Sequence, residues 1–117
     1  MTKKTPSVLG TLESALYADD LEAAKDFWQD VMGLQAFQTV PDRHVFFHIS
    51  ENPPQILLIF RAAETKKKPK PDARLPVPPH GTRGHGHFCL AVAPETLDAW
   101  CDHLKAKGVE VEADFNW

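Results

Sequence analysis

Three histidines lie close together where a stretch rich in proline and glycine gives way to an apolar one. His80, His85 and His87 fall within PPHGTRGHGHFCLAV, residues 78–92. Imidazole nitrogens bind divalent metals. Histidine is also an ordinary loop residue, so the cluster either contains a metal ligand or is part of a polar loop. The secondary structure predicted on either side of the cluster is needed to choose between these interpretations.

The first half of the chain has the pattern of a strand, a helix and three more strands. Residues 12–18, LESALYA, alternate as a strand does, and residues 20–33 carry apolar side chains at helical spacing. Asp19 is placed to cap this helix with Glu22 as its reciprocal partner, and Gly33 to end it in the left-handed conformation. Three extended runs, separated by turn signals, follow at residues 34–40, 43–49 and 55–61.

The second half repeats the start of this pattern. Residues 87–93, HFCLAVA, alternate again, residues 94–107 have helical spacing, and residues 108–115 have the pattern of a further strand. Glu13 and His87 occupy equivalent places in the two copies. Internal similarity of this kind indicates two copies of one supersecondary unit.

The faces of the two predicted strands indicate where Glu13 and His87 point. Side chains that share a face with the helix pack beneath it, which assigns to the core Leu12, Leu16, Phe88, Leu90 and Val92. Glu13 and His87 lie on the opposite face, beside small residues that leave space in front of the sheet. If the two halves pair, a carboxylate and an imidazole meet in that space, and these groups suit Zn, Fe, Ni or Mn.

The sequence resembles the vicinal oxygen chelate superfamily, which includes glyoxalase I, bleomycin and fosfomycin resistance proteins and extradiol dioxygenases. LESALYADDLEAAKDFWQDVMGL is similar to the opening of that family's first module, and GHGHFCLAVAPETLDAWCDHLKAKGVEV to the opening of its second. The resemblance implies an α+β fold in which paired βαβββ modules form a U-shaped half-barrel around a metal, with helices on the outer face.

This resemblance also divides the chain, which we expect to form a single domain. Module one covers residues 11–61, a Pro/Lys linker covers 62–84, and module two covers 85–117. Module two is expected to be incomplete, because the internal repeat leaves it without its last two strands. We therefore expect a truncated chain or a sheet completed by another chain.

The resemblance implies that Glu13 and His87 are metal ligands. The family's ligand from the last strand of module one falls near Leu57 and Leu58, which cannot bind a metal. Two protein ligands are too few when three are the usual minimum, so metal binding should be weak unless a partner completes the site. His80 and His85 are interpreted as loop residues or as donors that orient a ligand.

A substrate pocket is predicted in front of the sheet. Its candidate residues are Tyr17, His44, His48 and Cys89. Core packing would explain Tyr17, and a half-exposed sheet face would explain His44 and His48 equally well.

Two functions remain open. One is a metal-dependent lyase or dioxygenase of glyoxalase type, in which a divalent ion (Zn, Ni, Mn or Fe) binds vicinal oxygens of a small-molecule substrate. The other is a metal-free protein that binds or sequesters a drug in the same half-barrel, and a chain without activity in this form is the third alternative. The resemblance implies a homodimer, because members of the family often form one, and an uncovered strand edge independently predicts association.

Composition excludes several other classes. The chain has 117 residues and a net charge of −3, which gives no field to recruit nucleic acid or an anionic membrane. No apolar run approaches the ~20 residues of a membrane span, and the start lacks the core of a signal peptide, so we expect a cytoplasmic protein. The lysines of residues 66–70 are interpreted as a solvated linker, and Cys89 and Cys101 as free buried thiols.

Overall fold

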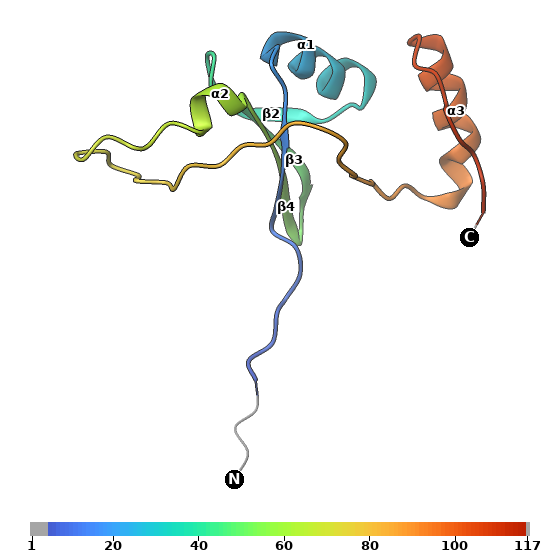
Figure 1. Cartoon of the computed structure of the whole chain (residues 1–117). Coiled ribbons are helices and arrows are strands. Elements are labelled where there is room, and N and C mark those ends of the chain that lie inside the picture. The colour runs from blue at the N-terminus through green and yellow to red at the C-terminus, as the bar shows by residue number, and fades with distance from the viewer. Residues whose placement is uncertain (1–4, 117) are drawn as a thin grey trace.

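The computed structural model describes residues 5–116, which form one four-stranded sheet and several helices (Figure 1). In chain order the elements are β1 (Glu13–Tyr17), α1 (Leu21–Asp26), η1 (Phe27–Val31), β2 (Gln35–Val40), β3 (His44–Glu51), β4 (Pro54–Phe60), α2 (Ala62–Thr65), η2 (Pro94–Thr96) and α3 (Leu97–Ala106). The sheet has the order β1-β4-β3-β2, with β1 parallel to β4 and the other neighbours antiparallel. The first half is therefore a βαβββ module, as predicted.

The first helix begins and ends near the predicted residues, with one correction. Asp20, and not Asp19, is the N-cap: its side-chain oxygen accepts a hydrogen bond from the Ala23 N–H at 3.0 Å. The predicted cap was one residue early, because both aspartates precede the helix and only the geometry selects between them. Gly33 has φ of 73° after η1, so the predicted left-handed ending is confirmed.

The core lies between the sheet and the first helix, which crosses one face of the sheet (Figure 1). Its buried residues come from α1, β3 and β4: Leu21, Val45, Phe47, Leu57 and Ile59. Leu16 and Phe88 pack against this cluster, as predicted. The residues of β3 and β4 that enter the core alternate with residues on the opposite face, as the pleat requires.

The second half departs from the sequence prediction. Residues 87–93 and 108–115 form no strand within the described chain, and Leu12 and Val92, predicted as core, are 58% and 39% exposed. A strand forms only where a neighbour pairs its backbone groups, and no neighbour does so here. The predicted helix is present as η2 and α3, but α3 stands beside the sheet and buries no residue (Figure 1).

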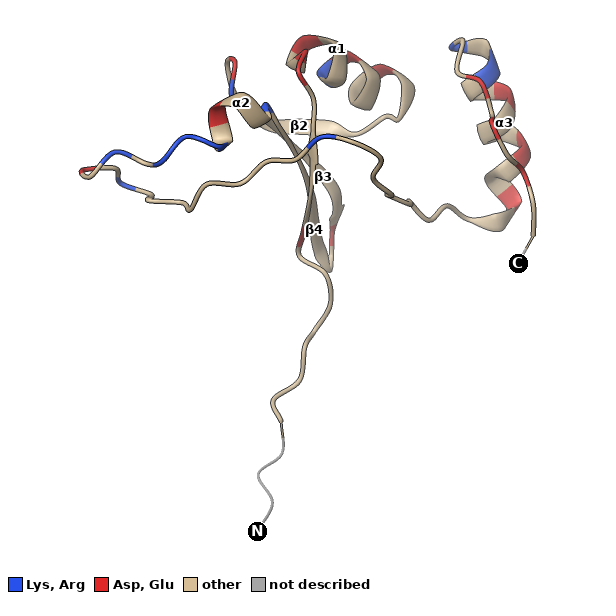
Figure 2. Ribbon diagram, viewed as in Figure 1, with Lys and Arg blue, Asp and Glu red and all other residues tan. Residues whose placement is uncertain are grey.

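The linker is a long loop with one firm attachment. Residues 66–80 form an outgoing arm that leaves α2 and a returning arm that runs alongside it, and lysines lie on the outgoing arm (Figure 2). At the end of the return, the His80 N–H donates to the Thr65 carbonyl at 3.0 Å. Gly81 then passes so close to α2 that an added Cβ would lie 3.1 Å from the Ala62 Cβ. The linker is thus docked on α2 at residues 80–81.

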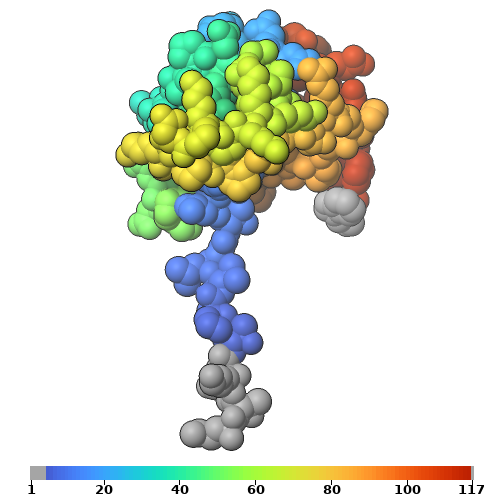
Figure 3. All heavy atoms as spheres, turned by 60° about the vertical axis from the view of Figure 1, so that its left-hand side comes forward, coloured from blue at the N-terminus to red at the C-terminus, as the bar shows by residue number. Residues whose placement is uncertain are grey.

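The remaining segments are peripheral. Residues 5–12 extend away from the body of the molecule as an exposed stretch (Figure 3).

The longest described helix, α3, has 10 residues. Over residues 5–116, no helix has the length and apolar character needed to cross a membrane.

Candidate functional site

A cavity of about 660 Å³ lies between the first strand and the segment that follows the linker. Its lining residues are Ala15, Leu16, Tyr17, Ala18, Asp19 and Ala62, together with residues 82–88. The first strand of module one and the beginning of the predicted second module therefore line the same hollow. It is large enough to hold a small organic molecule.

Two contacts hold residues 82–88 in this place. The Arg83 guanidinium donates to the Asp19 carboxylate at 2.7 Å, although both side chains are exposed and such pairs contribute little free energy. Phe88 packs edge-on against Trp28, with 6.2 Å between ring centroids, and reaches the core. The aromatic contact is therefore the stronger anchor.

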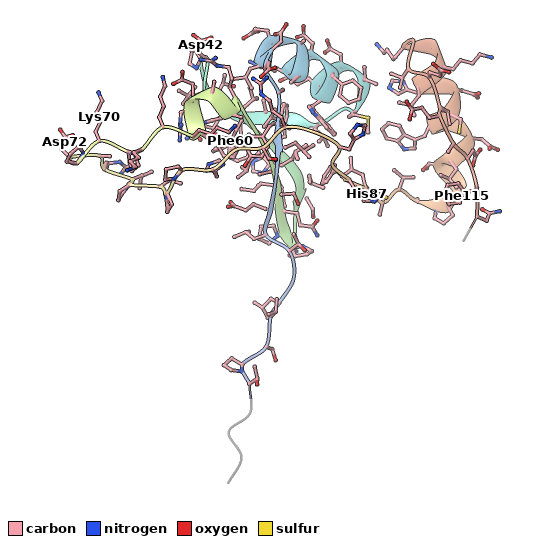
Figure 4. All side chains as sticks on the ribbon, viewed as in Figure 1. Asp42, Phe60, Lys70, Asp72, His87 and Phe115 are labelled. Carbon is pink, nitrogen blue, oxygen red and sulfur yellow. The ribbon has the colours of Figure 1, made fainter. Side chains whose placement is uncertain are left out.

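The two predicted metal ligands are not brought into one cluster by the described residues. His87 lines the cavity and lies on the segment that leaves the sheet for α3 (Figure 4). Its ring makes no hydrogen bond or ion pair with the rest of residues 5–116. Glu13 is exposed at the start of β1, outside the cavity wall and roughly 7 Å along the strand from Ala15.

An imidazole and a carboxylate fit a divalent metal in kind, but the number of donors falls short. Among residues 5–116, no three His, Cys, Asp or Glu side chains form a group that could hold a metal ion. Leu57 and Leu58 are buried and apolar, so β4 contributes no ligand. The described residues do not make a complete metal site, since a catalytic site usually has three protein ligands.

The sheet face opposite α1 carries a row of aromatic and imidazole rings. His44 stacks on Phe46 with 4.0 Å between centroids and 9° between planes, and His48 stacks on Phe37 at 4.2 Å and 25°. Phe60 continues the row from β4, edge-on to Phe46. His44 and His48 thus share a face, but neither lines the cavity beside β1.

His44 is the one buried titratable residue on this face. Its Nε2 lies 3.2 Å from the Gln38 Oε1, while its Nδ1 is buried without a hydrogen-bond partner among the described residues. Burial, and then the positive charge of Arg43, lower the pKa of His44 below its ordinary value of 6.5. Both effects favour the neutral ring, in which an Nε2–H donates to Gln38 and Nδ1 is left without a donor among residues 5–116.

Tyr17 and His80 form a pair that the sequence did not predict. The Tyr17 hydroxyl lies 2.8 Å from the His80 Nδ1, and Phe60 packs against both rings. The only sequence signal for a fixed position of His80 is the pair Pro78 and Pro79, which stiffen the chain before it. No local pattern connects residues so far apart in sequence.

The other two candidates differ in position. His85 lines the cavity beside His87. Cys89 and Cys101 are free thiols, but the prediction that they are buried is wrong: both are exposed, because within the described chain residues 87–93 pair with no strand and α3 buries no residue. The Cys89 Sγ lies 3.8 Å from the Leu90 carbonyl, and Cys89 is not part of the cavity wall.

The model of the Glyoxalase/Bleomycin resistance protein/Dioxygenase superfamily matches residues 10–116. The chain belongs to this superfamily. A lactoylglutathione lyase from Agrobacterium tumefaciens is 39% identical, with 97% of this chain and 80% of that protein covered and a TM-score of 0.80. No curated protein sequence matches the chain.

Two more distant structures show the same fold. An integron cassette protein from the mobile metagenome of Halifax Harbour sewage outfall has a TM-score of 0.68 at 18% identity, covering 93% of this chain and 79% of that one. The fosfomycin resistance protein FosX of Listeria monocytogenes, as an E126Q mutant with Mn(II) and a dihydroxypropylphosphonic acid, has a TM-score of 0.63 at 17% identity, covering 95% and 74%. At these identities the likeness concerns the fold alone.

Proposed function

We propose that this protein is a glyoxalase-type lyase whose substrate, a small molecule with adjacent oxygen atoms, binds in the cavity between β1 and residues 82–88. The observation that carries the proposal is that Tyr17 and His87 line one cavity, in a chain 39% identical to a lactoylglutathione lyase. Small-molecule sites are concave and combine an apolar wall with placed polar groups. This cavity combines the apolar Leu16 and Phe88 with polar side chains that include Tyr17, Arg83 and His87.

Glu13 and His87 are the residues that would hold a divalent metal. When bound, such an ion (Zn, Ni, Mn or Fe) polarises adjacent oxygens of a substrate and stabilises negative charge on them. Because two ligands do not hold a catalytic ion firmly, we propose that a second copy of the chain supplies the rest, in a homodimer.

The cavity's own side chains bind and orient the substrate. Arg83, at the rim, presents guanidinium donors that suit carboxylate or enolate oxygens. The imidazoles of His85 and His87 accept or donate hydrogen bonds, depending on their protonation. Leu16 and Phe88 supply apolar wall, which keeps water away from bound oxygen atoms and strengthens their polar contacts.

The test measures Mn(II) and Zn(II) affinity and the consumption of lactoylglutathione by wild type, Glu13→Ala and His87→Ala. We expect each substitution to weaken metal binding by at least roughly tenfold, since the loss of even a ligand's hydrogen-bond partner has an effect of that size. Glu95→Ala, which removes an exposed carboxylate at the start of η2, is the matched control and should change neither quantity. Unchanged affinity in both site variants would contradict the metal role.

The second candidate is a metal-free protein that binds an aromatic small molecule. The stacked pairs His44–Phe46 and His48–Phe37, together with the apolar Leu58, favour it. Planar rings stack on such faces with a useful gain in free energy. Binding of naphthalene sulfonate that persists in EDTA and weakens in Phe46→Ala, with no metal affinity in wild type, would select this candidate.

A further inference from the structure

The hydrogen bond between Tyr17 and His80 joins a strand of the sheet to the linker. The Tyr17 hydroxyl and the His80 Nδ1 are 2.8 Å apart, an ordinary hydrogen-bond distance for a hydroxyl donor. Phe60 lies edge-on to His80, with 4.6 Å between centroids, and 6.2 Å from the ring of Tyr17. Figure 4 labels Phe60 where the returning linker crosses the sheet. The two polar rings are therefore held together on an aromatic support.

His80 is fixed in position although it belongs to a long loop. Its backbone N–H donates to the Thr65 carbonyl, and Thr65 is itself buried. The next residue, Gly81, has φ of 148°, and an added Cβ would lie 3.1 Å from both the Ala62 Cβ and the Lys66 Cγ. A side chain at residue 81 would therefore strain the backbone and require its neighbours on α2 to shift. The backbone around His80 is thus built to hold the imidazole against Tyr17.

The pair lies between two hollows. Tyr17 lines the 660 Å³ cavity, whereas His80 lines a second hollow of about 310 Å³ between α2 and the linker. The charged or titratable groups on the first side are Asp19, Arg83, His85 and His87. Those on the second side are Arg43, Glu64, Lys67, Lys68 and Lys70. The pair therefore joins the wall of the first cavity to the wall of the second.

We propose that Tyr17 and His80 form a proton-transfer pair for the molecule bound in the cavity, with Tyr17 in contact with it and His80 as the positioning residue. The proposal rests on the proposed function for the presence of that molecule. A proton passes from the bound molecule to the Tyr17 oxygen while the phenol proton passes to the His80 Nδ1. This leaves an anion on the bound molecule, a neutral phenol and an imidazolium, and the reverse step returns the proton.

The pair can be tested without any ligand because Tyr17 is the only tyrosine in the chain. With tyrosine labelled at the ring carbon that bears the hydroxyl, one NMR resonance reports on this phenol alone. In wild type, this resonance should follow the ring signals of His80 through a pH titration. In His80→Asn, which keeps a hydrogen-bond partner but cannot take the proton, the shift should disappear. His103→Asn removes an imidazole on α3, outside both hollows, and is the matched control that should leave the shift in place.

The ligand arm uses lactoylglutathione as the probe, with binding measured by calorimetry. We expect Tyr17→Phe to weaken binding by up to roughly tenfold, the effect of one lost hydrogen bond. Where wild type consumes the probe, His80→Asn should lower turnover and flatten its pH profile while leaving KM nearly unchanged. A purely structural role for His80 would not produce this combination.

The two arms fail in different ways. A Tyr17 resonance that is flat while the ring signals of His80 titrate, or that shifts equally in His80→Asn, overturns the proton-transfer pair. So does wild-type binding of lactoylglutathione that leaves the Tyr17 resonance and the Tyr17→Phe affinity unchanged. If wild type binds no lactoylglutathione but the ligand-free titration behaves as expected, the pair stands and the proposed substrate fails.

Discussion

The two halves of this chain carry the same pattern of strand and helix, yet only one of them has a core. In the first half, β1 finds β4 at its side and α1 above it, and Phe47, Leu57 and Ile59 are almost fully buried. In the second half, residues 87–93 have no paired neighbour, and α3 buries no side chain. Alternation of apolar and polar residues therefore permits a strand, but the strand forms only where a neighbouring strand pairs with it.

The second half is nevertheless tied to the first at defined points. Phe88 packs on the core, Arg83 pairs with Asp19, and the His103 Nε2 lies 2.6 Å from the Val31 carbonyl. Phe88 and Arg83 also line the cavity, whereas His103 lies outside it. The cavity therefore has one wall from the packed half and one from a half that is held by a few contacts.

Hydrogen exchange should give the largest contrast between the halves. Backbone amides of β3 and β4 open only with the whole module, so we expect exchange slowed by about a thousandfold or more, as for a domain of ordinary stability. The amides of residues 87–93 donate no ladder hydrogen bonds and should exchange nearly as fast as in an unfolded chain. Exchange measured by mass spectrometry checks this, and equal protection in both segments would mean that residues 87–93 pair with another strand.

Shortening a side chain should cost the first half much more free energy of unfolding than the second half. Phe47→Ala removes a ring with no exposed surface and should lower the free energy of unfolding by about 3–5 kcal/mol. Leu97→Ala on α3 removes a side chain that is 55% exposed and should change it by under about 0.5 kcal/mol. Urea denaturation measures both values. A large loss for Leu97→Ala would show that α3 has a packing partner in solution.

The N-cap of α1 should contribute more stability than the N-cap of α3, by a smaller margin than the core side chains. The Asp20 side chain accepts the Ala23 N–H, so Asp20→Ala should destabilise the first half by about 1 kcal/mol. Thr96, at the start of α3, makes no cap bond to the helix, and its hydroxyl donates instead to the Ala93 carbonyl at 2.6 Å. Thr96→Ala should therefore matter less than Asp20→Ala in thermal unfolding. The reverse order would contradict the assignment of Asp20 as the cap.

Local patterns predicted the first module well because every element there meets its neighbour within the described chain. The βαβββ order, the left-handed Gly33 and the packing of Leu16 all followed from periodicity and turn chemistry. The choice between Asp19 and Asp20 failed because adjacent residues offer the same cap chemistry. The strand at 87–93 failed because its pattern says nothing about whether a partner is present.

The candidate site was predicted in part. The repeat pointed to the first strand and the region of His87, and both line the cavity, while the role of Glu13 and His87 in metal binding stays a prediction. The pairing of Tyr17 with His80 could not be predicted, because it depends on where the linker docks. That docking is set by the close approach of Gly81 to Ala62, a property of the folded chain.

The smallest expected effect concerns pH and the one imidazole that the first half buries. The pKa of His44 is lowered by burial and by Arg43, so below about pH 6.5 the unfolded chain takes up a proton that the folded chain resists. Stability present above that pH is then lost as pH falls toward the lowered pKa of the folded state. His44→Gln should flatten this decline in urea titrations between pH 7 and 5, whereas His103→Gln on α3 should leave it in place. If His44→Gln loses stability with falling pH as steeply as wild type, the decline comes from other groups and the buried ring of the stable half is not its source.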